Sequence, residues 1–206
     1  MASEKLDIKA EDLEVGDELI AERRSKAPGD LPDDLHGWRR SVITGLDTLS
    51  LWVGKIVAWM VIPVIIAMVY EVVARKLFVA PTDWAYDISR MTIGAMFMLG
   101  AGYALMRGVH IRADFLYRNW KVRNQARLDL LLYLLFFFPG MGFFLWVSAD
   151  YWWASVVRWE RTMDTAWMAP LAPARTAMPL GALFLILQGI SEVLKCEYAI
   201  KTNRWP

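Results

Sequence analysis

Apolar residues are gathered into four long runs along the chain, separated by short charged junctions. The uncharged centres of these runs are residues 56–70, 91–106, 130–149 and 176–191. A helix rises 1.5 Å per residue and the hydrocarbon of a bilayer is about 30 Å thick, so about 20 apolar residues cross it. With their flanking residues, the runs predict membrane-spanning helices over residues 52–74, 84–107, 129–150 and 176–195. The third run has no polar face at the 3.6-residue period, which argues against a soluble helical bundle.

The first forty residues differ in composition from the rest. They hold eleven of the 22 acidic residues, few aromatic residues and no apolar stretch of seven or more. Such a segment cannot bury enough apolar surface to form a core, and it shows no cleavable signal peptide. We therefore expect a hydrophilic acidic tail at residues 1–40, partly disordered, and a four-helix transmembrane domain at residues 41–206.

Lys and Arg are more frequent on one side of the predicted spans. Eleven lie just before the first span (Arg39 and Arg40), between the second and third, and after the fourth, against six on the other side. Because basic residues in short loops are retained in the cytoplasm, this bias predicts that both termini are cytoplasmic. Most of the Trp residues fall near span ends, where an indole suits the headgroup layer.

The centres of the spans offer little for chemistry or for solvating a solute. Their uncharged runs contain no Asp, Glu, Lys, Arg or His. Two His, one in the tail and one in a loop, cannot supply a bis-histidine haem, and a single Cys cannot hold an iron–sulfur cluster. There is no nucleotide-binding glycine loop and no catalytic triad. The sequence therefore predicts a membrane protein that is not an enzyme and that holds no cofactor or metal.

Small residues recur along the second span. Gly100, Ala104 and Gly108 are spaced by four, so they share one face if the helix is continuous. Small residues let helix backbones approach closely in lipid. This face either packs against another span of the same chain or docks a partner, and the sequence leaves both possibilities open.

Polar residues flank the second span in an ordered pattern. Before it, Asp87 suits the positive end of the helix dipole, and Arg90 follows three residues later, close enough to pair with it. After it, Arg107, His110 and Asp114 would line one face if the helix continued through them. These residues either form an interfacial network that ends one helix and starts another, or they contact a partner.

The same junctions carry a resemblance to a known family. The first has the pattern Trp-x-x-acid-x-x-Arg at Trp84, Asp87 and Arg90, and the second has Arg-Gly-x-His-Ile-x-x-Asp at Arg107, Gly108, His110, Ile111 and Asp114. Residues 45–195 are similar to the small membrane subunit of the tripartite ATP-independent periplasmic (TRAP) transporters. Asp87 departs from the pattern, since the family more usually has Glu there.

The resemblance implies an all-α, four-helix subunit of the bacterial inner membrane, bound to a large multi-span subunit that carries the substrate and sodium sites. A periplasmic solute-binding protein would deliver the solute, commonly an organic acid. On this account the chain is a scaffold that contacts lipid, binds neither substrate nor nucleic acid, and leaves the substrate unspecified. The residues expected in its partner interface or structural motif are Trp84, Asp87, Arg90, Gly100, Ala104, Arg107, Gly108, His110 and Asp114.

Two other functions fit four apolar spans. The chain could be a membrane anchor of a respiratory complex, in which case haem absorbance would accompany the purified complex. It could also be a self-sufficient small transporter that works as a homodimer, in which case it would transport solute without a second subunit.

Overall fold

The computed structural model describes residues 31–32, 34–35, 37–108 and 121–205. The described chain is helical, and four of its helices are long and apolar enough to cross a membrane. They comprise α2 (Trp38–Trp59) with α3 (Val61–Leu77), then α4 (Trp84–Met106), then α6 (Val122–Leu132) with η1 (Tyr133–Phe137) and α7 (Phe138–Arg158), and α8 (Ala172–Thr202). The prediction of an all-helical protein with four spanning helices is confirmed. The tail before residue 31, and its expected disorder, lie outside the described residues.

The first helix begins at Trp38 rather than at residue 52, inside the segment predicted as tail. Its added turns are amphipathic, because Ile43, Asp47 and Ser50 are buried on one face at helical spacing. A search for long apolar runs finds helices surrounded by lipid, and it misses a stretch whose polar face is covered by another helix. The boundary between tail and membrane domain at residue 40 remains a prediction.

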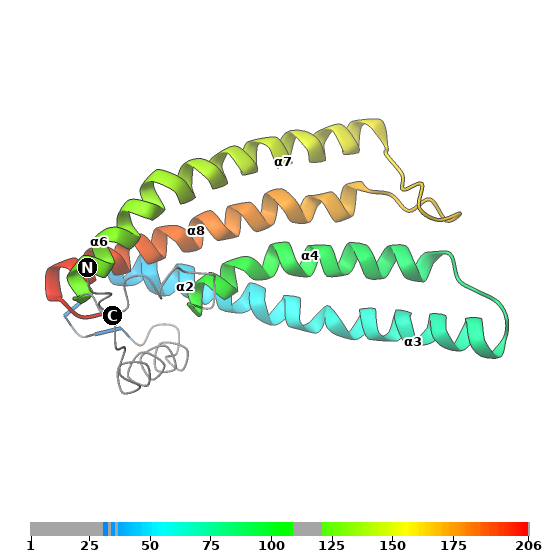
Figure 1. Cartoon of the computed structure of the whole chain (residues 1–206), viewed down its shortest axis with the longest axis horizontal. Coiled ribbons are helices and arrows are strands. Elements are labelled where there is room, and N and C mark those ends of the chain that lie inside the picture. The colour runs from blue at the N-terminus through cyan, green and yellow to red at the C-terminus, as the bar shows by residue number, and fades with distance from the viewer. Residues whose placement is uncertain (1–30, 33, 36, 109–120, 206) are drawn as a thin grey trace, which may run out of the picture.

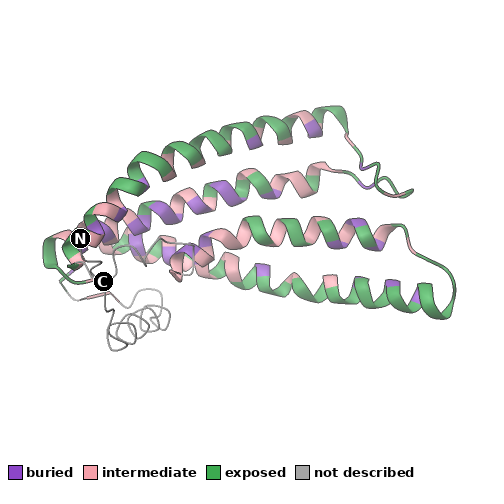
Figure 2. Ribbon diagram, in the orientation of Figure 1, coloured by how far each residue is buried: buried purple, intermediate pink, exposed green. Residues whose placement is uncertain are grey.

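Over most of their length the helices lie in a row in the order α7, α8, α4, α3 (Figure 1). α8 packs against α7 on one side and against α4 on the other, while α2 contacts both α4 and α8. The edge helices α7 and α3 each have one main neighbour, so most of their surface is exposed (Figure 2). The most apolar stretches of the spanning helices differ in how far they are buried. In α8, 44% of the residues in this stretch are buried, whereas in the helix formed by α6, η1 and α7 only 6% are buried. α8 is therefore the centre of the packing.

Glycine sets the closest approach between the two central helices. A Cβ placed on Gly181 of α8 would lie 2.5 Å from the carbonyl oxygen of Met98 in α4. A Cβ on Gly102 of α4 would lie 3.4 Å from the carbonyl oxygen of Phe184 in α8. Backbones that approach this closely gain dispersion contacts that lipid cannot replace. The tight α4–α8 contact thus uses glycines other than those of the predicted small-residue face.

Two prolines coincide with irregular turns. α2 ends at Trp59 and α3 begins at Val61, and Pro63 cannot donate a hydrogen bond back to the carbonyl of Trp59. Pro139 follows the π-helical segment η1 in the same way. Both irregularities bend continuous rods and do not divide them into separate spans.

Candidate functional site: two polar clusters at opposite ends of the helix row

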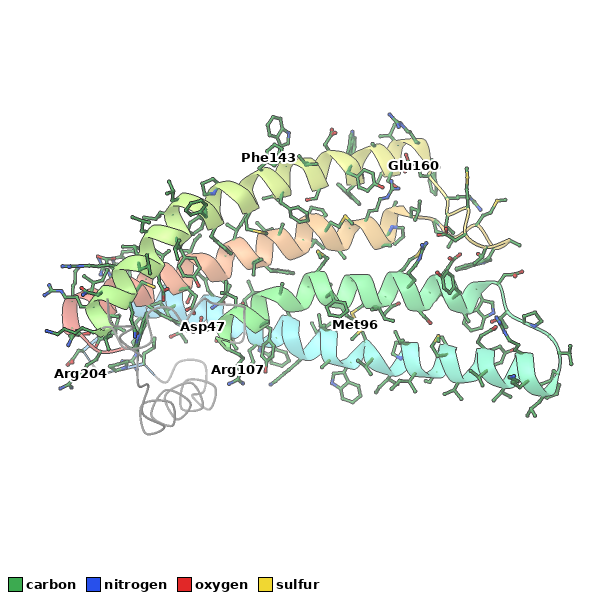
Figure 3. All side chains as sticks on the ribbon, in the orientation of Figure 1. Asp47, Met96, Arg107, Phe143, Glu160 and Arg204 are labelled. Atoms are coloured by element: carbon green, nitrogen blue, oxygen red, sulfur yellow. The ribbon has the colours of Figure 1, made fainter. Side chains whose placement is uncertain are left out.

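The segment between α7 and α8 folds back on itself at one end of the row, where Glu160 is labelled (Figure 3). The amide of Thr162 donates to the carbonyl of Ala169 at 2.9 Å, and the amide of Leu171 donates to the carbonyl of Glu160 at 3.0 Å. These bonds close the connection into a compact loop. The loop lies against the first turns of α4.

Side chains from this loop and from α4 form the first polar group, which we term the loop cluster: Asp87, Arg90, Thr162, Asp164 and Thr165. Asp87 is fully buried, and the hydroxyl of Thr165 donates to its Oδ2 at 2.5 Å. The guanidinium of Arg90 forms an ion pair with Asp164 and lies 4.0 Å from Oδ1 of Asp87. The predicted pair of Asp87 and Arg90 is therefore a long contact, and Arg90 mainly holds the loop. Within the described residues, Oδ1 of Asp87 accepts no hydrogen bond.

Removing the hydroxyl of Thr165 should destabilise the loop cluster. Thr165→Ala leaves the buried carboxyl of Asp87 without its short hydrogen bond, which costs about 1–3 kcal/mol. Thr165→Ser keeps the hydroxyl and should restore most of that stability. Thermal unfolding of the purified complex measures both variants, and equal melting temperatures for them would contradict the assigned bond.

The loop should also open in acid. The hydroxyl of Thr162, followed by the guanidinium of Arg90, lowers the pKa of Asp164 from its ordinary value of 3.8. A lowered pKa means that the contact stabilises the fold above pH 3.8 and that this stabilisation is lost as pH falls through the folded-state pKa. Cleavage of the loop by pepsin should therefore increase with acidity below that value. Asp164→Asn should be cleaved at a rate that no longer depends on this titration.

Other residues expected at the motif are placed around α4. Trp84 stacks on Tyr70 of α3, with ring centroids 5.6 Å apart. Gly100 faces α2, where an added Cβ would lie 3.6 Å from Val57, and Ala104 is half-buried one turn later. The predicted small-residue face therefore packs within the chain over these two residues.

The helix α4 does not continue as far as Gly108. α4 ends at Met106, and Gly108 adopts a left-handed φ of 66°, so it does not share the face of Gly100. Arg107 caps the helix, and its Nε donates to the hydroxyl of Tyr103 at 3.2 Å. His110 and Asp114 lie outside the described residues, so their expected role remains a prediction.

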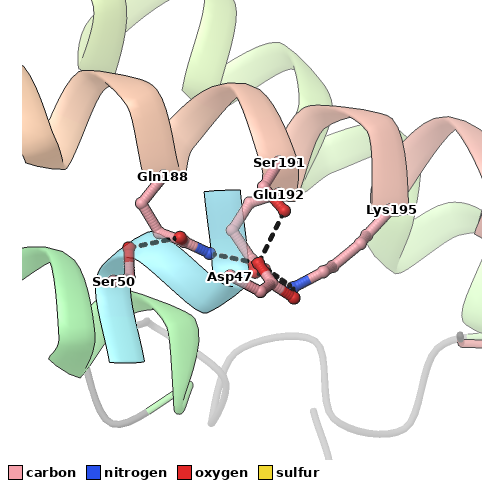
Figure 4. Close-up of polar contacts among 6 residues, drawn as sticks. All are labelled: Asp47, Ser50, Gln188, Ser191, Glu192 and Lys195. Atoms are coloured by element: carbon pink, nitrogen blue, oxygen red, sulfur yellow. Dashed lines mark hydrogen bonds and ion pairs between the residues drawn. The ribbon is translucent and has the colours of Figure 1, made fainter. Parts of the chain in front are cut away.

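A second polar group joins α2 to α8 near the opposite end of the row, where Asp47 is labelled (Figure 3). We term it the α2–α8 cluster; it consists of Asp47, Ser50, Gln188, Ser191, Glu192 and Lys195 (Figure 4). Oδ1 of Asp47 accepts hydrogen bonds from Gln188 at 2.9 Å, from Ser191 at 2.8 Å and from Lys195 at 3.2 Å. The ammonium of Lys195 also lies 2.9 Å from Oδ2 of Asp47 and 2.9 Å from Glu192.

The α2–α8 cluster buries three ionisable side chains with a formal charge of −1. The exposed fractions are 8% for the side chain of Asp47, 4% for Glu192 and 12% for Lys195. Burying an isolated charge is costly, and pairing with good hydrogen bonds offsets the cost. The orientation of the Gln188 side-chain amide is also fixed, because the hydroxyl of Ser50 donates to its Oε1 at 2.7 Å. Its arrangement suits fixing α2 in register on α8.

The α2–α8 cluster is absent from the sequence-based expectations, although a signal for it exists. Gln188, Ser191, Glu192 and Lys195 have the spacing of one helical face, which marks a polar stripe on an otherwise apolar helix. From the sequence, Lys195 counts only as a basic residue flanking the last span. Asp47 precedes the predicted first span, so nothing in the sequence joins it to that stripe.

Smaller ion pairs complete both ends of the row. Glu71 of α3 binds Arg75 and accepts the backbone amide of Thr82 at 2.8 Å, which ties the end of α3 to the turn before α4. Arg39 of α2 lies 3.0 Å from Glu197 of α8. The part of the chain that the structure describes contains no group of three or more His, Cys, Asp or Glu placed to hold a metal ion.

Comparison with models of known protein families gives a match. The family model for "Tripartite ATP-independent periplasmic transporters, DctQ component" matches residues 64–197. No curated protein and no solved structure matches the chain. The matched residues cover more than half of the chain and include the loop cluster and the α8 side of the α2–α8 cluster, but not Asp47. The chain therefore belongs to the DctQ family, the small membrane component of the TRAP transporters, and it is a transporter subunit and not an enzyme.

Proposed function

We propose that this DctQ chain is the scaffold subunit of a sodium-coupled TRAP transporter in the bacterial inner membrane. The transporter imports an organic acid that a periplasmic binding protein delivers. The large membrane subunit binds the solute and sodium, and this chain braces it while it moves. Both termini of this chain are cytoplasmic, as the excess of Lys and Arg on that side favours.

The observation that carries this proposal is the use the chain makes of its buried charges. In the described helices these charges gather towards the two ends of the row and are bound by other groups of the chain: Asp47 binds Lys195 of α8, and Glu71 binds Arg75 and the backbone amide of Thr82. A solute pathway keeps polar groups open to its cargo near mid-membrane, whereas these groups are engaged in joining helices. The arrangement suits a brace better than a carrier.

The open row of helices also suits a subunit that acts in a complex. Four helices folded into a closed bundle would cover one another, but here the apolar side chains of α3 and α7 are largely exposed. Lipid and a larger membrane partner can both cover such surfaces. The family's partnership with other TRAP components agrees with this arrangement.

Reconstitution tests the proposal directly. Proteoliposomes that contain the large subunit, this chain, the binding protein and a sodium gradient should take up the organic acid. Vesicles with this chain and the binding protein, but without the large subunit, should show only background uptake. Uptake by this chain without the large subunit, or density for solute or sodium among its side chains, would overturn the scaffold assignment.

A further inference from the structure

Contacts between neighbouring helices define which residues lie at the same level along the row. The continuous helix formed by α6, η1 and α7 is antiparallel to α8. Three contacts define their relative levels: Phe137 of η1 beside Gly189, Tyr151 of α7 beneath Arg175 at 3.9 Å, and the amide of Arg123 of α6 at 3.2 Å from Oδ1 of Asn203. The sum of the two residue numbers is the same in all three pairs, as expected for antiparallel helices. The register between the two helices is therefore constant along their whole contact. A residue on α7 can therefore be assigned a level on α8.

The other helices are placed in the same way. α4 and α8 run parallel, with Met98 level with Gly181 and Gly102 level with Phe184. The first helix is antiparallel to α4, with Val57 beside Gly100 and Tyr70 stacked on Trp84. These contacts give every spanning helix a position on one scale, that of α8.

The apolar runs are not centred at one level on this scale. Each run should be centred on the middle of the hydrocarbon, because its charged ends avoid it. The centres of the uncharged runs fall level with Ile186 for α7, Phe184 for α8 itself, Gly181 for α4 and Arg175 for α3. The shift has one direction across the row and amounts to roughly eleven residues, or about 16 Å at 1.5 Å per residue.

We propose that the row is inclined in the bilayer by about 30°, with the α3 edge and the α7 edge displaced toward opposite sides of the membrane. Adjacent helices lie about 8–10 Å apart, so three spacings separate the edges by about 24–30 Å, and a shift of about 16 Å across them gives this angle. Tilts of this size occur among membrane-spanning helices. The apolar surface is thus an oblique belt that fits a bilayer.

The inclination accounts for two charged positions. Asp150 is exposed on α7 and lies level with Thr176, where an upright row would place it inside the hydrocarbon. In the inclined row it lies at the hydrocarbon boundary, at the end of the run 130–149. Lys55, on the first helix, likewise stands directly before the run 56–70 and over the ring of Trp52 at 5.0 Å.

The inclination also determines which helix ends extend beyond the bilayer into water. On the side where α2 begins, the first turns of α2 from Trp38 project beyond the hydrocarbon, whereas Ser50 is held within it by its hydrogen bond to Gln188 in the uncharged run of α8. On the other side, α7 projects from Asp150 to Arg158. These two projecting helix ends are the parts of the row that aqueous segments of a partner can reach.

Depth measurements on level pairs distinguish an inclined row from an upright one. Leu134 of η1 is level with Gly45 of α2, and Val157 of α7 is level with Val69 of α3; all four are exposed. Each is replaced by a spin-labelled cysteine, in the assembled complex in vesicles, with the buried Cys196 changed to Ala. Leu134 and Val69 should be more accessible to oxygen than to a water-soluble nickel chelate, and Gly45 and Val157 should show the reverse.

Equal depths within each pair would overturn the proposal, because an upright row places level residues at the same depth. Gly45 is suited to labelling since no atom lies within 4 Å of an added Cβ. Cryo-electron microscopy of the complex in lipid nanodiscs measures the angle directly, even where a partner covers a labelled position. An angle of about 30° between α8 and the membrane normal is expected, and a value below about half of that would refute the inclination.

Discussion

Lys195→Met is expected to destabilise the protein by about 3–5 kcal/mol, the typical cost of removing one partner from a buried ion pair. The reason is the charge balance of the α2–α8 cluster. Lys195 lies 2.9 Å from both Asp47 and Glu192, so its removal leaves two buried carboxylates facing each other without a cation. Chemical or thermal unfolding of the purified complex, followed by tryptophan fluorescence, measures the loss.

Asp47→Asn is the matched control, and its effect should be smaller, about 1 kcal/mol. This change leaves Lys195 paired with Glu192, and the amide oxygen of the new side chain can still accept from Ser191. Adding Asp47→Asn to Lys195→Met removes one of the two opposed carboxylates and should recover part of the stability. If Asp47→Asn were as damaging as Lys195→Met, the charge-balance argument would be wrong.

Gly181→Ala is expected to cost about 2–3 kcal/mol, in the upper part of the range for overpacked cores. The added methyl would lie 2.5 Å from the carbonyl oxygen and 2.7 Å from the carbonyl carbon of Met98. Those atoms are backbone, so relief requires α4 and α8 to separate along their whole contact. The melting temperature of the complex and its recovery with the large subunit should both fall.

Gly140→Ala provides the control for this substitution. Gly140 also lies in a spanning helix, but it is on the exposed side of α7, where no atom lies within 4 Å of an added Cβ. Alanine has the higher helix propensity, so this variant should be neutral or slightly stabilised. Equal losses from Gly181→Ala and Gly140→Ala would show that close packing of α4 on α8 is not the cause.

The parts of the fold that depend on whether a segment is surrounded by lipid or by water could be predicted from the sequence. The uncharged run at residues 130–149 has no polar face, and lipid is the one environment that accepts such a helix on all sides. The same reasoning located α4 to within a residue at its start, because Trp84 and Asp87 mark its entry. The motif around Trp84, Asp87 and Arg90 also indicated the family that the match over residues 64–197 establishes.

Prediction was weakest where one helix covers another. Asp47 in the amphipathic start of α2 resembles any solvated acid until α8 places Lys195 beside it. Spacing alone pairs Arg90 with Asp87, yet the nearest carboxylate of Arg90 is Asp164, which lies far along the chain and is brought close by the folded loop. Contacts over such separations leave no local pattern in a single sequence.

By itself, the sequence determined that four helices cross the membrane, which junctions carry charge and which family the chain resembles. Those properties follow from each segment's own exchange with lipid and water, and every residue contributes to them locally. Only the tertiary structure decided that the helices form a row, that Gly181 brings α4 against α8, and that Asp47 and Lys195 share a buried cluster. Packing in lipid depends on shape and on partner groups from distant segments, because hydrophobicity does not distinguish one apolar neighbour from another.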